Sequence, residues 1–568
     1  MRRVTLAALL CSTAALAQVN WPTRPDAGLV VNGPAQFVQD MAAASTPDGG
    51  VAVIWAQRDA TPWSVRVQRV DALGNKAWGD AGVELDQVPG AAVGRMALLG
   101  DDVGGLWAAW AGTDQRRETN VQRVSPAGVP LWGDGGVTLE APLNPTWWLR
   151  LNADPGRGAW LMFRSGNIGT DYKSAPLTDA PPTVWYSPGI GGDSQDRLQC
   201  AVFNDGRYLV AGGVLGYTQS KFQILSRSGG ILVDGGVPLS PNRPRSFEVV
   251  KGDDDMPIIF WEEGTTQGLI HAQKVRPDGG MVWSQDGGLI VGWTGMDTSF
   301  SRQPSAVSDG DGGAVVVWQG HDGGYRAFAQ HLGADGTLLW NSGQPVVVGD
   351  THYGGWARVG RDQAGKYLVI WPRDQSFPNR QMAMRLDTDG TPLWGSTPTA
   401  GPGVLWAEFQ IDQCNAGNCH DHVFMFPSGD GMVIAEVHAY EVMLHRIRPD
   451  GTLGGPLAVD AGTDAGTQDA GAGDAGAPDA GTADAGAPDA GTPDAGTPDA
   501  GIPDAGAPDA GQPAPDAGAP PQTDGGLSGT DGGTEPPTGT GCGCTTGAGA
   551  WPSLLLLAMT LRRRRPRA

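Results

Sequence analysis

The chain has 568 residues, 40% of them hydrophobic and 21 of them Trp, so it is long and apolar enough to bury a sizeable core. Its formal net charge of -22 disfavours nucleic acid and anionic lipid as partners, because both would be repelled. No basic stripe with interleaved aromatic residues offsets that charge. The sequence therefore predicts no nucleic-acid partner.

Residues 1–17 have the three parts of a secretory signal. Arg2 and Arg3 supply the positive start, an apolar run follows, and the segment ends in small residues at Ala17. A lipoprotein signal at Cys11 is disfavoured because bulky Leu10 precedes that cysteine. The segment predicts export, with signal cleavage after Ala17.

A unit of about fifty residues recurs eight times between Val38 and Val459. It is clearest from Asp309 to Val348, where short β-rich runs alternate with Gly and Asp turns. Runs and turns at this spacing indicate a meander of antiparallel strands. The length of the period is typical of propeller repeats.

Two Trp positions mark the repeat. The first ends an apolar run and holds Trp55, Trp110, Trp261, Trp318 and Trp371, with Phe163, Gly213 and Glu436 in the weaker copies. The second follows a turn glycine and holds Trp78, Trp132, Trp283, Trp340 and Trp394, with Trp185, Val233 and Leu453 in the weaker copies. Since each sits at a fixed offset from a Gly turn, we expect the second Trp to wedge between neighbouring sheets.

A four-stranded sheet of this size cannot cover both of its faces, so neighbouring copies must stack. Radial stacking leaves only short, protected edges. The sequence therefore predicts an all-β fold over residues 18–459, a β-propeller of eight four-stranded antiparallel blades, or seven if one weak copy is absorbed. Leu29 to Val31 resembles a closing strand and is predicted to pair with the last blade. The recurring Gln68, Gln122, Gln273 and Gln330 are predicted to make architectural hydrogen bonds between strands or blades.

The repeats resemble those of secreted bacterial β-propeller proteins. Their turn-plus-Trp half, as in Gly128 to Trp132 and Gly336 to Trp340, is similar to the tryptophan docking motif of quinoprotein-like propellers. This resemblance implies a mode of blade packing, and it implies no chemistry.

Residues 460–541 differ abruptly from the repeats. They hold 14 Asp, one Glu and no Lys or Arg, and Asp recurs every five residues from Asp464 to Asp509. With almost no large apolar side chain, this segment is predicted to be a disordered linker. Calcium binding by the regular Asp residues is disfavoured, because isolated carboxylates on a mobile chain make a poor cage.

Residues 542–568 contain Cys542 and Cys544, an apolar run up to Leu561, and five Arg. The run predicts a short hydrophobic helix, which is too brief for a secure membrane span. The segment resembles the MYXO-CTERM sorting signal of myxobacterial surface proteins. That resemblance implies membrane contact through this segment, processing near one of the two cysteines by a rhombosortase-like or CAAX-protease-like enzyme, and delivery to the cell surface, in the outer membrane or outside it. An unprocessed inner-membrane tail anchor is the alternative.

The remaining cysteines are interpreted in the oxidising context that export implies. Cys414 and Cys419 are candidates for a small surface disulfide, whereas Cys200 is expected to be a buried, small apolar residue. The adjacent His420-Asp421-His422 would need a third ligand to hold a metal. We therefore predict no metal site there.

Candidate catalytic groups are few. Glu262, Glu263 and Glu436 interrupt apolar positions, and lining of the channel or contact with solvent is the favoured interpretation. The Asp/Gly turns, such as Asp253 to Asp255, lack the full spacing of a calcium loop, although one structural calcium stays open. The sequence contains no G-x-S-x-G, phosphate-loop or H-E-x-x-H motif. No catalytic, metal or cofactor residue is assigned.

These features favour a cell-surface propeller that acts as a binding or interaction module for a glycan or protein. Aromatic candidates for its contact surface are Trp63, Trp147, Trp148, Trp293 and Tyr353. The alternative function is a secreted polysaccharide hydrolase or lyase with carboxylates in the channel. A passive surface-layer role is the third hypothesis.

Overall fold

The structure is a computed structural model that describes residues 21–455 apart from short internal gaps, of which 188–198, 294–303 and 410–422 are the longest. The chain divides into Met1–Asp469 and Ala470–Ala568, and all described residues belong to the first unit. The predicted signal, linker and C-terminal helix therefore lie outside the described residues. Within them, no helix has the length and apolar character needed to cross a bilayer.

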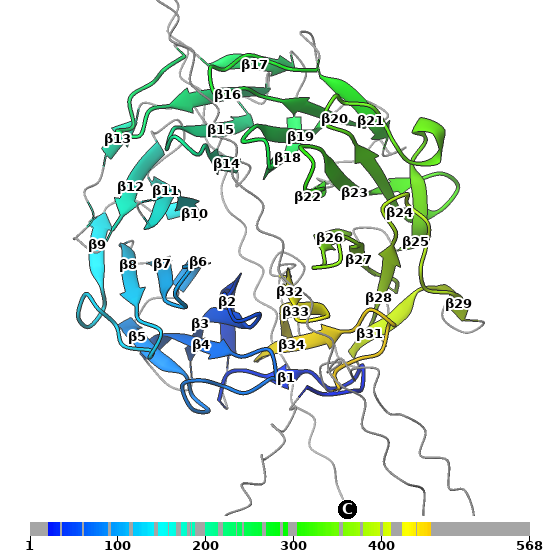
Figure 1. Ribbon diagram of the computed structural model, residues 1–568. Coiled ribbons are helices and arrows are strands. Elements are labelled where there is room, and N and C mark those ends of the chain that lie inside the picture. The colour runs from blue at the N-terminus through cyan, green and yellow to red at the C-terminus, as the bar shows by residue number, and fades with distance from the viewer. Residues whose placement is uncertain are drawn as a thin grey trace, which may run out of the picture. The chain divides into compact units, whose positions relative to one another are not determined.

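Eight four-stranded antiparallel sheets form the blades of a propeller ring (Figure 1). Blade 1 is β2 (Phe37–Ser45), β3 (Val51–Arg58), β4 (Trp63–Val70) and β5 (Val83–Val88); blade 2 is β6 (Val93–Gly100), β7 (Leu106–Gly112), β8 (Thr119–Val124) and β9 (Val137–Glu140); blade 3 is β10 (Thr146–Asp154), β11 (Gly158–Ser165), β12 (Tyr172–Leu177) and β13 (Trp185–Ser187); blade 4 is β14 (Gln199–Val202), β15 (Tyr208–Gly213), β16 (Ser220–Leu225) and β17 (Val237–Ser240).

The second half of the ring follows the same plan. Blade 5 is β18 (Pro244–Lys251), β19 (Pro257–Glu263), β20 (Leu269–Lys274) and β21 (Leu289–Trp293); blade 6 is β22 (Ser305–Ser308), β23 (Ala314–His321), β24 (Tyr325–Leu332) and β25 (Val346–Asp350); blade 7 is β26 (Arg358–Arg361), β27 (Tyr367–Pro372), β28 (Asn379–Leu386) and β31 (Val404–Phe409); blade 8 is β32 (Phe424–Ser428), β33 (Gly431–His438), β34 (Glu441–Ile447) and β1 (Leu29–Val30). The short pair β29 (Ser396–Thr397) and β30 (Gly401–Pro402) lies in the last connection of blade 7, and the 3-10 helix η1 (Asn341–Gly343) lies in blade 6.

The earliest strand of the chain closes the ring. Leu29 and Val30 pair with Leu444 and Met443 of β34, so β1 is the outer strand of blade 8. The Val31 N–H donates to the carbonyl of Val442 at 2.8 Å and extends the ladder. The predicted pairing of this segment with the last blade is confirmed, and it covers the edge that β34 would otherwise expose.

The Trp residues after the turns wedge between blades, as predicted. Trp340 of blade 6 lies against Gly390 of blade 7, where a Cβ would come within 2.8 Å of the indole. Its Nε1 donates to the carbonyl of Thr388, two residues before that glycine, at 2.8 Å. Trp283 and Trp394 repeat the arrangement on Gly336 and Gly451 of their following blades.

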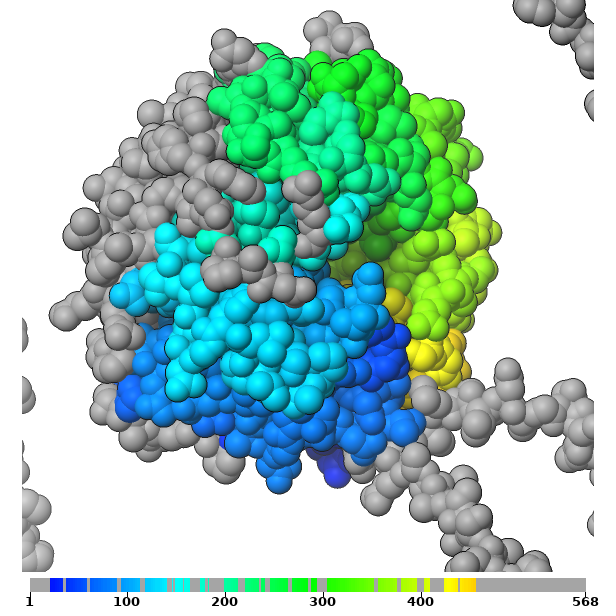
Figure 2. Space-filling view, turned by 60° about the vertical axis from the view of Figure 1, so that its left-hand side comes forward, coloured from blue at the N-terminus to red at the C-terminus, as the bar shows by residue number. Residues whose placement is uncertain are grey.

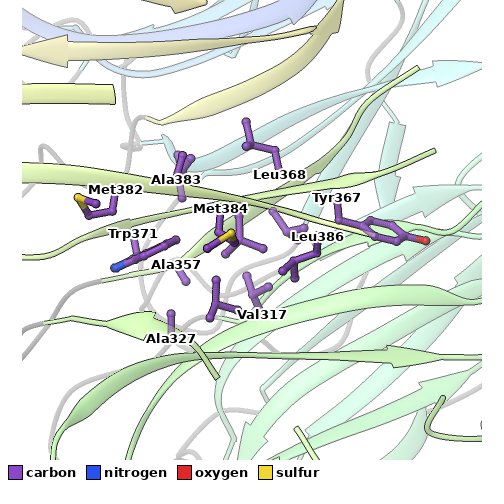
Figure 3. Close-up of a cluster of buried hydrophobic side chains, with 14 of the residues drawn as sticks. Val317, Ala327, Ala357, Tyr367, Leu368, Trp371, Met382, Ala383, Met384 and Leu386 are labelled. Carbon is purple, nitrogen blue, oxygen red and sulfur yellow. The ribbon is translucent and has the colours of Figure 1, made fainter. Parts of the chain in front are cut away.

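The first Trp position joins blades in the opposite direction. Trp371 of β27 packs against Gly349 in the outer strand of the preceding blade, and its Nε1 donates to the carbonyl of Asp350 at 2.9 Å. Figure 3 shows Trp371 beside Ala357 and Met382 in a core that also takes in Val317 of blade 6. Each well-formed blade is thus fixed to both neighbours by indoles, and burial of one such ring contributes several kcal/mol.

The recurring glutamines are architectural, and their hydrogen bonds stay inside one blade. The Oε1 of Gln330 accepts the N–H of Trp340 at 3.1 Å and the N–H of His331 at 2.9 Å. Gln68, Gln122 and Gln273 accept the backbone N–H of their own docking Trp in the same way. Each glutamine therefore holds the loop that presents the indole, instead of joining two blades.

The sequence alignment of the weaker copies needs two corrections. In blade 4 the first Trp position is held by Gly212, and not by Gly213. Tyr208 pairs with Leu225 as Tyr367 pairs with Leu386, and Gly212 follows Tyr208 by four residues as Trp371 follows Tyr367. Leu453 is equivalent to Leu338, since each forms a bridge with the last residue of the third strand. Trp340 follows Leu338 by two residues, so Gly455 holds the second Trp position in blade 8.

The missing indole of blade 8 comes from Trp21, ahead of the first repeat. Its Nε1 donates to the carbonyl of Ala72 at 2.8 Å, and Ala72 precedes Gly74 by two residues, as Thr388 precedes Gly390. Trp21 is 4% exposed and packs in the core shared by blades 8 and 1. The segment from Trp21 to Val31 therefore supplies blade 8 with both a strand and an indole.

Candidate functional site

The first strand of every blade lies next to the axis of the ring (Figure 1). Side chains on these strands are more exposed than those on the second strands, which are almost wholly buried. Figure 2 shows a hollow in the surface, with the blue and cyan blades on one side of it and the green blades on the other. The first strands thus line a channel that water can enter.

Three charged side chains occupy one level of this channel. Arg150 pairs with Met162, Glu248 with Phe260 and Arg358 with Ile370, and each partner directly precedes the first Trp position of its blade. The three residues are therefore equivalent in blades 3, 5 and 7. We call them the charged layer.

The other blades carry uncharged residues at the same level, which are small in three blades and are Gln199 in blade 4 and Phe424 in blade 8. Ala42 pairs with Ile54 in blade 1, Ala97 with Ala109 in blade 2, and Ser305 with Val317 in blade 6. A propeller strand at this position therefore needs no charge to fold. The charged layer is an addition to the scaffold.

The three charges influence one another across the axis. Blades 3 and 7 are not neighbours of blade 5, yet both Arg150 and Arg358 act on the Glu248 carboxylate. The surrounding protein raises the pKa of Glu248 above its ordinary value by desolvation, and the two guanidinium charges only partly oppose that shift.

The carboxylate of Glu248 has no close partner among the described residues, which give it neither a hydrogen bond nor an ion pair within 4 Å. Glu248 is half-buried, Arg150 is exposed and Arg358 is half-buried. The two cationic groups and the carboxyl group therefore do not neutralise one another at contact distance, and the Arg358 guanidinium lies over the Trp356 ring, 5.8 Å from its centroid.

Cys200 lies near this layer and serves packing. The Nδ2 of Asn152 donates to its Sγ at 3.0 Å, and burial raises the pKa of the thiol to about 11. A neutral, buried thiol is inert at physiological pH. The expectation that Cys200 is a buried small residue is confirmed.

Glu262 and Glu263 do not line the channel or face solvent, contrary to expectation. They are 0% and 3% exposed at the end of β19. Glu263 Oε2 lies 3.4 Å from His271 Nε2, its Oε1 accepts a hydrogen bond from the Ser240 hydroxyl, and the His271 ring stacks on Trp261. This cluster belongs to the contact between blades 4 and 5, because Trp261 packs in the core shared by these blades.

Glu436 is likewise buried, and it lies 3.1 Å from His445 in blade 8. His445 in turn stands edge-on to Trp406 of blade 7, with ring centroids 5.2 Å apart. A buried Glu–His pair that touches the next blade is part of blade packing. Alternation of side chains along a strand led us to expect an exposed Glu436. It is buried because a neighbouring blade covers this end of the strand.

The Asp/Gly turns use their carboxylates internally. The Oδ1 of Asp309 accepts the N–H groups of Asp311 and Gly313, both at 2.8 Å, while its Oδ2 contacts His331 Nε2 at 2.8 Å. Asp254 contacts Lys274 Nζ at 2.5 Å in the equivalent place of blade 5. Among the residues that the structure describes, no group of three potential ligands could hold a metal ion.

The predicted aromatic surface is divided. Trp63 is 7% exposed and packs edge-on against Phe37, under the Arg58 guanidinium at 5.2 Å. Trp293 is 40% exposed beside Phe328. Tyr353 lies outside the described residues, as do the side chains of Trp147 and Trp148.

Several other predicted positions lie outside the described residues: Ala17, Cys414, Cys419, His420, Asp421, His422, Cys542 and Cys544. The signal, the loop disulfide and the sorting signal therefore stay predictions. Sequence reasoning missed the charged layer, although each of its three members lies thirteen residues before the first Trp position of its blade, a spacing that could have found it.

A second concave region of about 460 Å³ lies on the outer side of blades 1 and 2. It is lined by Glu84, Asp86 and Asp134 among others. The Oδ2 of Asp86 already accepts the Nε1 of Trp110 at 3.1 Å. This acidic groove lacks convergent groups of opposite sign and is a weaker candidate than the charged layer.

No protein family matches the sequence, and no curated protein matches it either. Solved structures with a similar fold include the BP39L lectin of Burkholderia pseudomallei, at 14% identity and a TM-score of 0.40 over 63% of this chain and 98% of the lectin. An ulvan lyase of polysaccharide lyase family PL25 is 11% identical, with a TM-score of 0.37 over 62% of this chain and 92% of the lyase. The NanB sialidase of Streptococcus pneumoniae is 9% identical, with a TM-score of 0.32 over 62% and 68%. Likenesses this distant carry no argument about function.

Proposed function

We propose that the ring is a ligand-binding module displayed outside the cell, and that its ligand contacts the charged layer of the channel. The observation that carries this proposal is the set of three charges at one level of the axis, where the other five blades have the uncharged residues Ala42, Ala97, Gln199, Ser305 and Phe424. Ligand sites in proteins are concave, with a few convergent polar groups drawn from separate elements. The charged layer has this character.

The energetics of the layer favour binding over a structural role. A half-desolvated carboxylate that has no close partner among the described residues costs free energy in the empty ring. Burial holds the pKa of Glu248 high in spite of two nearby cations, which is the sign of such a cost. A bound ligand that supplies donors and acceptors would offset this cost.

The alternative, a polysaccharide hydrolase or lyase with carboxylates in the channel, has less support. Hydrolysis of a glycosidic bond usually needs two carboxyl groups on either side of that bond. The charged layer contains one carboxyl group and two guanidinium groups. The buried pairs Glu263–His271 and Glu436–His445 lie in contacts between blades.

Display outside the cell is the second part of the proposal. It rests on residues 1–17 as a signal, residues 460–541 as a spacer, and processing near Cys542 or Cys544 as a sorting step. Intact mass and terminal sequencing of the protein from fractionated cells test it. Cleavage after Ala17 and recovery at the surface are expected, and an unprocessed cytoplasmic chain would refute it.

A capture screen tests the binding role. The full exported protein is presented with glycan arrays and with extracellular material, beside the variant R150A/R358A. The control R24A/R276A removes the same charge from two exposed side chains with local partners, Asp26 and Asp278. We expect a ligand that wild type and control retain and that R150A/R358A binds at least tenfold more weakly. Equal retention by all three, or turnover of the retained glycan, would contradict the proposal.

A further inference from the structure

We infer that the group held at the charged layer is an anion, a carboxylate or sulfate group of a larger acidic ligand, seated between Arg150 and Arg358. This inference rests on the proposed function, because it names the chemistry of the ligand for the same site.

The two arginines provide the donors. A guanidinium group has five N–H donors in a planar fork that matches carboxylate and sulfate oxygens. Arg150 and Arg358 lie at the level of Glu248 on the first strands of blades 3 and 7, and the charges of both reach the Glu248 carboxyl group of blade 5. Charge-assisted hydrogen bonds to an anion are roughly twice as strong as neutral ones.

The local charge differs in sign from that of the whole chain. The protein has a net charge of -22, whereas the charged layer has two cations and one carboxyl group. Charges more than about 10 Å away are largely screened at physiological ionic strength. An anion at the layer therefore experiences the two guanidinium groups more strongly than the acidic surface.

Glu248 makes anion binding depend on pH. The groups that face it across the channel are Arg150 and Arg358. On the strands packed against β18, β14 carries the neutral thiol of Cys200, β15 carries the buried phenol of Tyr208, and Ser305–Ser308 of β22 contains no ionisable side chain. β19 carries the buried Glu262 and Glu263, of which Glu263 is paired with His271. When Glu248 is protonated, it no longer repels an anion and its O–H can donate to one.

The sign of the pH effect follows from linkage. An anion binds more tightly to the protonated form of Glu248, so binding raises the pKa of this carboxyl group further. Affinity for the anion is therefore highest below that pKa and falls as the pH rises through it. Glutamine at position 248 mimics the neutral carboxyl group at every pH.

Calorimetric titration of the full exported protein with inorganic sulfate tests the inference, from about pH 4.5 to about pH 8. We expect the affinity of wild type to fall severalfold as the pH rises. E248Q is expected to bind sulfate with little pH dependence and, at high pH, at least as tightly as wild type. R150A/R358A is expected to lose the sulfate signal while its melting temperature stays unchanged. Equal sulfate binding by wild type and R150A/R358A, or no binding by wild type, would overturn the inference.

A second titration separates a free anion from an acidic group on a larger ligand. Its probes are a uronic-acid oligosaccharide and the methyl ester of the same oligosaccharide. Tighter binding of the acid than of sulfate, and at least tenfold weaker binding of the ester, support the inference. Equal affinity for acid and ester would overturn it. A neutral ligand from the capture screen that R150A/R358A fails to retain would overturn the anion assignment and leave the binding role standing.

Discussion

One glycine in each well-formed blade determines how closely the docking Trp of the preceding blade can approach. Gly390 has a φ of +84°, and a Cβ there would lie 2.8 Å from Trp340. A side chain at this position would therefore strain the backbone and also push the indole away. The contact between this glycine and the indole explains why a turn glycine and a Trp recur at a fixed spacing in the sequence.

We predict that G390A destabilises the protein by about 2–4 kcal/mol, which combines backbone strain with overpacking. Gly323 is the matched control, because its φ is +95° but no atom lies within 4 Å of the site of its Cβ. G323A should cost about 1 kcal/mol from strain alone. Denaturant midpoints measure both, and equal losses would show that the Trp contact contributes nothing.

At the residue scale, spacing predicted packing but not the site. Fixed Gly-to-Trp intervals identified the docking indoles, and the repeated Gln identified an architectural hydrogen bond. Arg150, Glu248 and Arg358 also share an interval, because each lies thirteen residues before the first Trp position of its copy, at Phe163, Trp261 and Trp371. That interval was a usable signal, but it does not show which positions of a first strand line the channel, which depends on how the blades are arranged in the ring.

The segment from Trp21 to Val31 is the element on which closure of the ring depends. It brings a strand to β34 and an indole to the turn of blade 1. Similarity of Leu29 to Val31 with other closing strands predicted the first role. Trp21 escaped prediction because it precedes the repeat, although the absence of Trp at Gly455 was a signal that one indole had to come from elsewhere.

We predict that W21A lowers stability by about 3–5 kcal/mol, the usual cost of removing a buried Trp. W293A is the control, since Trp293 is 40% exposed and the hydrogen bond it accepts from Trp318 uses the backbone carbonyl. Its cost should be below about 1 kcal/mol. Thermal melts compare the two variants. An unchanged melting temperature after deletion of residues 21–31 would refute this account of ring closure.

At the scale of the whole molecule, the ring brings together side chains that are far apart in the chain. Fold class and repeat number followed from the period of the sequence, because stacking of incomplete sheets leaves few alternatives. The burial of Glu262, Glu263 and Glu436 did not follow, since it results from covering by the adjacent blade. Channel chemistry is likewise a property of the closed ring and of no single blade.

The pKa of Glu248 tests the charged layer most directly. Carbon-13 NMR of glutamate-labelled protein, with E248Q to assign the signal, gives the pKa of the Glu248 side chain with and without sulfate. We predict a pKa above the ordinary value of about 4.3, and a further rise when sulfate is present. An ordinary pKa that sulfate leaves unchanged would contradict the binding site proposed for this channel.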